Sequence, residues 1–151
     1  MKAISLRQPW LWIVVHLDKC IENRRWNTHY RGFVLLHASS ACSRLEYSEA
    51  VEWVRLTISP DLAMKIPPRV ELPFGGICGR AEIVDVLPPR LGRPSKGEGE
   101  APYPAGVDGR WHMPEQYGFI LANVVQTPFV PCKGALSLFD LDEDVVRRCA
   151  A

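Results

Sequence analysis

The feature of this sequence that most constrains the fold is an apolar run close to its beginning, "WLWIVVHL" over residues 10–17. Pro9 precedes the run, and proline is favoured in the first turn of a helix. A helix over these residues is apolar on nearly every side, which indicates a helix buried inside a core. The run is shorter than the roughly 18–20 residues that a membrane helix needs. It therefore predicts a globular domain with an early buried helix and no membrane partner.

Runs with alternating or β-rich character predict up to six strands around this helix. In the second of them, Glu22, Arg24 and Trp26 fall on one face, because successive side chains of a strand point to opposite sides. Glycines precede the third and open the fourth, as is usual at strand boundaries. The predicted strands cover residues 2–7, 20–26, 33–39, 75–87, 117–130 and 133–141.

Two further helices and one long loop complete the predicted architecture. Ser43 and Glu46 have the spacing of a capping box at the start of a helix over residues 43–58, which Pro60, Pro67 and Pro68 bring to an end. Residues 142–150 place acids first and arginines last, as suits the dipole of a short terminal helix.

Residues 88–109 hold five prolines and five glycines, and a loop of this length is either functional or disordered. We therefore expect a single α+β domain over residues 1–151. Its core is a small β-barrel of five to six strands, with one buried N-terminal helix and one or two further helices packed outside.

The distribution of charge limits the class of partner. The net charge is only +1, yet residues 1–44 carry seven Lys or Arg against two Asp or Glu. Such an excess favours a local site for an anion. It does not suit a protein that coats long stretches of duplex, because that function needs many phosphate contacts.

The five cysteines are scattered and form no Cys-x-x-Cys pair, which argues against a disulfide framework. The four histidines do not stand at zinc-ligand spacing from any cysteine. The apolar run also lacks the flanks of a signal peptide. We therefore expect a cytoplasmic protein with free thiols and with no metal or other cofactor.

Several segments, taken in order, resemble the ASCH domain, a branch of the PUA-like β-barrel superfamily. Its signature, Gly-x-Lys-x-x-Glu/Thr-x-Arg, is matched at Lys19, Glu22 and Arg24, although the opening glycine is replaced. The segments that carry the resemblance are "ISLRQPW", "DKCIENRRW", "YRGFVLLHAS", "YGFILANV" and "PFVPCKGALSLFDL".

The resemblance implies a barrel with a cleft, and PUA-like barrels often bind RNA or modified nucleotides. Some ASCH proteins are amidohydrolases that deacylate N4-acetylcytidine with the signature lysine, a threonine and a glutamate. Others are described as ribonucleases or as partners of transcription coactivators. This chain has Glu22 where the amidohydrolases have threonine, and Glu82 is a candidate for the separate glutamate only by its strand position.

Lys19 and Glu22 are the candidate catalytic residues. A partly desolvated lysine beside Arg24 would be a base or nucleophile, and Glu22 would relay a proton or hold the ammonium as an anion anchor. Arg24 offers a planar fork to a phosphate, a carboxylate or a base edge. Without the resemblance, the same residues would be taken as a solvated face of weak ion pairs.

The candidate binding residues each have a structural alternative. Trp26 would stack on a base or fill the core at a strand end, and His37 would contribute a polar contact or serve the fold. Asn123 would contact a base edge or tie a bulge, and Trp10 would line the cleft or the core. The full set of candidate binding residues is Arg7, Gln8, Trp10, Arg24, Trp26, His37, Ser39 and Asn123.

Three functions fit these observations. The first is binding of RNA or a modified nucleotide or nucleoside, short or single-stranded. The second is enzymatic, namely amidohydrolysis of an N4-acylated cytidine-type substrate. The third is a protein-interaction domain. Whether the chain is an enzyme stays open at the level of sequence.

Overall fold

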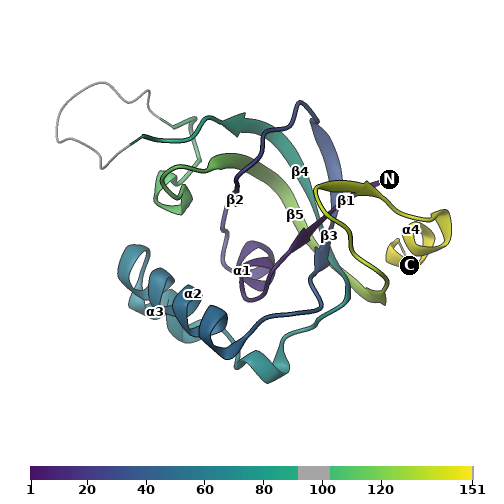
Figure 1. Cartoon of the computed structure of the whole chain (residues 1–151), viewed down its shortest axis with the longest axis horizontal. Helices are drawn as coiled ribbons and strands as arrows, with labels where there is room; N and C mark the ends of the chain where they lie inside the picture. The colour runs from purple at the N-terminus through teal and green to yellow at the C-terminus, as the bar shows by residue number, and fades with distance from the viewer. Residues whose placement is uncertain (92–102, 151) are drawn as a thin grey trace.

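The computed structural model describes residues 1–91 and 103–150, so residues 92–102 of the expected loop lie outside the described residues. One mixed six-stranded sheet curls into a half-barrel (Figure 1). Its strands lie in the order β2-β5-β4-β3-β1-β6. Their bounds are β1 Lys2–Leu6, β2 Ile21–Arg24, β3 Gly32–Ala38, β4 Gly76–Leu87, β5 Tyr117–Pro131 and β6 Leu138–Asp140.

Bulges in the two longest strands help the sheet to curl. β1 and β3 are parallel, with Ser5 opposite His37, and the other pairs are antiparallel. The register of β4 against β5 shifts three times, and Asn123 in β5 adopts a left-handed backbone with φ 50°. Because bulges bend a strand and increase its twist, the β4–β5 pair bends round the concave side.

Helix α1 (Trp10–His16) lies between this concave side and the outer helices (Figure 1). Its Leu11 and Val14 pack with residues of the sheet, while Ile13 packs against α2 and Trp111. The predicted buried helix is thus confirmed, although Trp12 is only half-buried and stacks on His16. Asp18 follows with φ 53°, the left-handed conformation that commonly ends a helix, and the chain turns into β2.

Helix α2 (Arg44–Thr57) carries the capping box expected from the sequence. The Glu46 amide donates to Ser43 Oγ over 3.1 Å, and the Ser43 amide donates to Glu46 Oε2 over 2.7 Å. A second helix, α3 (Pro60–Lys65), was not expected from Pro60. Proline is tolerated at the first position of a helix, and the Ser59 side chain caps α3. Pro60 therefore begins α3 as well as following the end of α2.

The remaining helices lie elsewhere on the sheet. α4 (Glu143–Cys149) packs with Ala3, Leu35, Ile77 and Val130 on the face opposite α1, and short 3-10 turns cover Arg69–Glu71 (η1) and Gly109–Trp111 (η2). In the described residues, no helix has the length and apolar character needed to cross a membrane.

The α+β fold class is confirmed, and the curled sheet with its helices is consistent with a PUA-like barrel. The strand expected over residues 133–141 is shorter in the structure, because only Leu138–Asp140 pairs with β1. The preceding residues, 132–137, form an irregular segment that we call the rim segment. Ser137 ends it with φ 60°, a left-handed backbone that a regular strand does not accept.

Candidate functional site

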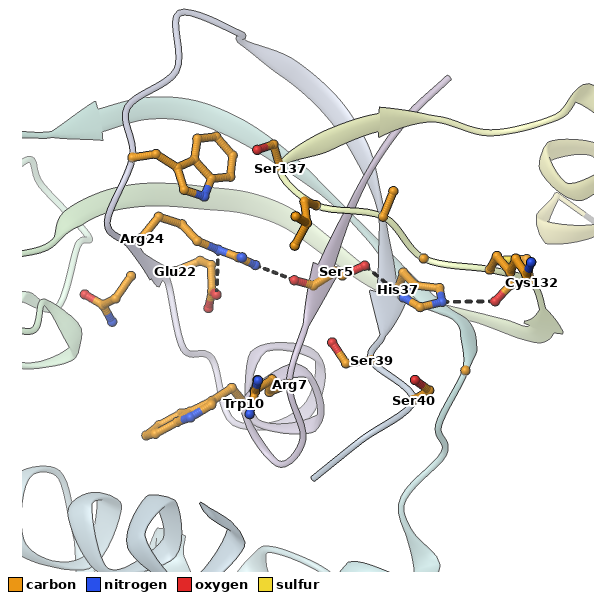
Figure 2. A pocket seen from close by; sticks show the side chains of 17 residues that line it. Ser5, Arg7, Trp10, Glu22, Arg24, His37, Ser39, Ser40, Cys132 and Ser137 are labelled. Atoms are coloured by element: carbon orange, nitrogen blue, oxygen red, sulfur yellow. Dashed lines mark hydrogen bonds and ion pairs between the residues drawn. The ribbon is translucent and has the colours of Figure 1, made fainter. Parts of the chain in front are cut away.

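A cleft of about 980 Å³ opens on the concave side of the half-barrel. β2 and the residues after it, the β1–α1 turn, the end of β3 and the rim segment form its walls (Figure 2). Its lining residues are Ser5, Arg7, Trp10, Glu22, Asn23, Arg24, Trp26, His37, Ser39, Ser40, Gly75, Cys132, Lys133, Gly134, Ala135, Leu136 and Ser137. Seven candidates from the sequence are among them: Arg7, Trp10, Glu22, Arg24, Trp26, His37 and Ser39.

An ion network connects β2 with the turn before it. Glu22 Oε2 accepts a hydrogen bond from Lys19 Nζ over 3.0 Å, and Arg24 Nε lies 3.2 Å from Glu22 Oε1. The predicted alternation of β2 therefore brings the carboxylate and the guanidinium to the same side. The two cations flank one carboxylate, which leaves a net positive charge in the network.

Arg24 also organises the aromatic part of the cleft. Its Nη2 donates to the main-chain oxygen of Ser5 over 2.5 Å, and its guanidinium carbon lies 5.9 Å from the centre of the Trp26 ring. Trp26 packs edge-on against Phe119, with ring centroids 5.0 Å apart. The core thus fixes the tryptophan, and the tryptophan with Ser5 fixes the guanidinium.

Lys19 lies beneath the cleft and is not among its lining residues. The residue is 2% exposed, and its Nζ donates to the main-chain oxygen of Ile21 as well as to Glu22. The ammonium also lies 5.6 Å from the centre of the Trp10 ring. Lys19 is therefore a buried, well-bonded cation that supports Glu22 and Trp10 from behind.

Two further candidates lie away from this cleft. Gln8 is buried, where its Oε1 accepts from the Trp12 amide and its Nε2 donates to the Pro73 oxygen, so it serves the start of α1. Asn123 lines a separate hollow and donates to Glu82 Oε2 over 2.7 Å. Its contacts match the bulge-tying alternative, and Glu82 is not among the residues that line the main cleft.

His37 joins the β1–β3 pair to the rim segment. Its Nδ1 lies 3.0 Å from Ser5 Oγ, and its Nε2 lies 3.1 Å from the Cys132 main-chain oxygen (Figure 2). Because a carbonyl oxygen only accepts, Nε2 carries the proton in this arrangement and Nδ1 accepts from the Ser5 hydroxyl. Burial lowers the pKa of His37, while the bond to Cys132 raises it in part.

Glycine at position 134 lets the rim segment approach this pair. A Cβ placed on Gly134 would lie 2.4 Å from His37 Cε1 and 2.7 Å from Ser5 Oγ, closer than real Cβ atoms come. The absence of a side chain therefore allows the backbone to cover His37.

Sequence reasoning missed the rim segment, Asn23, Ser5 and Ser40 as cleft residues. Asn23 holds the cleft wall to η2, because it donates to the Trp111 oxygen and accepts from the Met113 amide. A signal for the rim segment was present in "PCKG", where proline and glycine interrupt the run between two strands.

Within the described ranges 1–91 and 103–150, no group of three His, Cys, Asp or Glu side chains is placed to hold a metal ion. All five cysteines are free thiols. Of the charged residues that line the cleft in the same ranges, Arg7, Arg24 and Lys133 are basic and Glu22 is acidic. The electrostatics therefore favour an anionic or electron-rich ligand.

The half-barrel and its cleft define a PUA-like domain. A family model for the ASCH domain matches residues 4–124, and the chain belongs to the ASCH domain family. The ASCH domain is a PUA-like domain of an RNA-binding type. A comparison with curated proteins gave no match.

Proposed function

We propose that this ASCH domain binds single-stranded RNA, or a modified nucleotide or nucleoside, in the cleft. The observation that carries the proposal is the arrangement of Arg24 and Trp26, with the guanidinium carbon 5.9 Å from the ring centre and Glu22 alongside. An aromatic face next to a planar guanidinium suits an unstacked base. The fork of the guanidinium suits a base edge or a phosphate.

The charge and size of the cleft support a short ligand over a duplex. Its basic lining residues are few, and Arg7 is already paired with Glu46. A duplex-binding surface gains its affinity from many phosphate contacts. One or a few nucleotides match what this cleft offers.

The second candidate is hydrolysis of an N4-acylated cytidine-type substrate, with Lys19 as base or nucleophile. The observation in its favour is the 3.0 Å Lys19–Glu22 pair directly below the cleft, with Glu22 reaching into it. The burial of Lys19 and its hydrogen bond to the Ile21 oxygen argue against the hydrolase function. A nucleophile needs a free amine within reach of the substrate, so binding is the better supported function.

Titration with short single-stranded RNAs and free nucleotides at physiological salt tests the proposal. Arg24→Ala should weaken binding strongly, and the exposed neighbour in Arg25→Ala should matter little. If no RNA or nucleotide binds above non-specific levels, the proposal is wrong. Co-purification of a protein in place of nucleic acid would favour a protein-interaction domain. Deacylation of N4-acetylcytidine that Lys19→Ala removes would favour the hydrolase.

A further inference from the structure

We infer that the cleft selects a base whose pairing edge carries an amino group beside a ring-nitrogen acceptor, adenine or cytosine, and that Glu22 is the residue that selects it; this inference rests on the proposed function. It concerns which base the cleft prefers, and it follows from the different contacts of the two carboxylate oxygens of Glu22.

The two oxygens of Glu22 have different surroundings. Oε2 accepts from the buried Lys19 ammonium. Oε1 lies 3.2 Å from Arg24 Nε, but that N–H does not point at it well enough to form a hydrogen bond. Oε1 therefore keeps the capacity to accept. Figure 2 shows the carboxylate below the Arg24 side chain and on the side of Trp10, in the space that the cleft residues surround.

An acceptor fixed in this way discriminates between base edges. A carboxylate flanked by two cations accepts hydrogen bonds and donates none. The amino groups of cytosine and adenine donate to such an oxygen, and Glu or Asp accepting from cytosine N4 is an established pairing. Uracil and hypoxanthine have a carbonyl oxygen at the same position, which faces the carboxylate oxygen with no proton between them.

The use of Oε2 also disfavours guanine. Guanine presents two adjacent N–H donors on its pairing edge, and a carboxylate satisfies both only with both oxygens. Oε2 is directed at the buried Lys19 ammonium and away from the cleft, so only Oε1 faces the base. One guanine donor would then have no acceptor in line with it, and an unmet donor in a desolvated site is costly.

The same carboxylate orients the ligand in the cleft. Oε1 is a negative acceptor, so a phosphate oxygen directly beside it is unfavourable even though the network of Lys19, Glu22 and Arg24 is positive as a whole. The base, and not the phosphate, therefore lies at the β2 end beside Arg24 and Trp26. The phosphate is then directed to the other end, where Lys133 and Ser40 line the cleft. One nucleotide therefore spans the cleft from β2 to the rim segment.

The test is a titration of the intact chain with nucleoside 5′-monophosphates in matched pairs, followed by tryptophan fluorescence. The pairs are cytidine against uridine and adenosine against inosine, which differ in the amino and oxo groups that meet Glu22. We expect the amino member of each pair to bind at least about tenfold more tightly. We expect guanosine monophosphate to bind as weakly as the oxo members.

Glu22→Gln should reduce the preference to less than about threefold or invert it, because a carboxamide also donates. Its amide oxygen still accepts from Lys19, and urea denaturation checks that the variant is folded. Glu52→Gln removes the same charge from the exposed face of α2, where Glu52 pairs with Arg55, and should leave the preference unchanged.

Equal affinity within both pairs for the unaltered protein would overturn the inference while leaving the proposed function in place. Absence of binding by every nucleotide and every short RNA would overturn the proposed function and the inference together. Because the paired comparison uses the unaltered protein, a Glu22 variant that does not fold still leaves the inference open to refutation.

Discussion

Arg24 on β2 donates a hydrogen bond of 2.5 Å to the main-chain oxygen of Ser5 on β1. In the sheet these two strands are separated by β5, β4 and β3, so the bond crosses the open side of the half-barrel. The same guanidinium lies against Trp26 and beside Glu22. One side chain therefore holds the mouth of the cleft at its width and forms part of its lining.

Arg24→Lys should weaken both functions of this side chain while keeping its charge. Lysine has no planar fork and cannot reach Ser5 and Glu22 together. We expect the free energy of unfolding to fall by about 1–3 kcal/mol, and nucleotide affinity to fall at least about tenfold. Urea denaturation and fluorescence titration measure the two effects. Arg25→Lys, at the exposed next position, is the control, and identical behaviour of the two variants would contradict the assignment.

Gly134→Ala should displace the rim segment. The added methyl group would meet the His37 ring and the Ser5 hydroxyl, which are held in place by their hydrogen bond to each other and by the bond from His37 to the Cys132 oxygen. Overpacking of this kind costs about 1–3 kcal/mol. Ala135→Ser, at the exposed neighbouring position, should cost little. Unchanged stability and unchanged nucleotide affinity for Gly134→Ala would show that the segment is not held at this point.

His37 should make stability fall as the pH drops below the ordinary histidine pKa of about 6.5. Burial lowers its pKa in the folded protein. A lowered histidine pKa means that the fold favours the neutral ring, so its contribution is complete above the ordinary value of about 6.5. That contribution is lost as the pH falls through the folded value. Burial acts in the same direction on His16.

The pH effect is measured as the difference between variants in urea denaturation at several pH values. His37→Gln should flatten the dependence, whereas His29→Gln, at an exposed position, should not. Ion pairs lower the pKa of the Asp108 and Asp140 carboxyl groups, so these groups affect stability only at lower pH. A His37→Gln protein with the full slope would exclude the buried ring as its source.

The elements of the fold were largely predictable because their signals are local. The run over residues 10–17 predicted α1, and Ser43 with Glu46 marked the start of α2. Pro60 was misinterpreted because proline both ends one helix and begins another, and only the cap from Ser59 distinguishes the two. Residues 133–137 were misassigned because apolar composition does not reveal which backbone pairs with a neighbouring strand.

The part of the candidate site that depends on the alternation of side chains along β2 could be predicted from the sequence. The part that depends on tertiary packing could not. The period of a strand placed Glu22 and Arg24 together. It could not reveal that Ser5 lies across the cleft from Arg24, since strand order is not local information. The sequence also led us to expect a partly desolvated Lys19 that acts as a base or nucleophile, whereas the structure shows its ammonium group buried and bonded to Ile21 and Glu22.

Lys19→Met should therefore lower stability substantially. The Lys19 side chain is 1% exposed and the Glu22 side chain 11% exposed, and removing one member of a buried ion pair leaves the other charge without compensation. Arg24 remains beside the carboxylate and offsets part of this loss. We expect the free energy of unfolding to fall by about 3 kcal/mol, at the lower end of the range for such pairs.

The double variant Lys19→Met with Glu22→Gln should recover part of the loss, because the buried charge is then gone. Lys65→Met, at an exposed position, should change stability by less than about 0.5 kcal/mol. Urea denaturation of the unaltered protein and of these three variants measures the differences in the free energy of unfolding. A Lys19→Met protein as stable as the Lys65 control would mean that the ammonium is not needed to hold Glu22, and that Lys19 is free to act on a ligand.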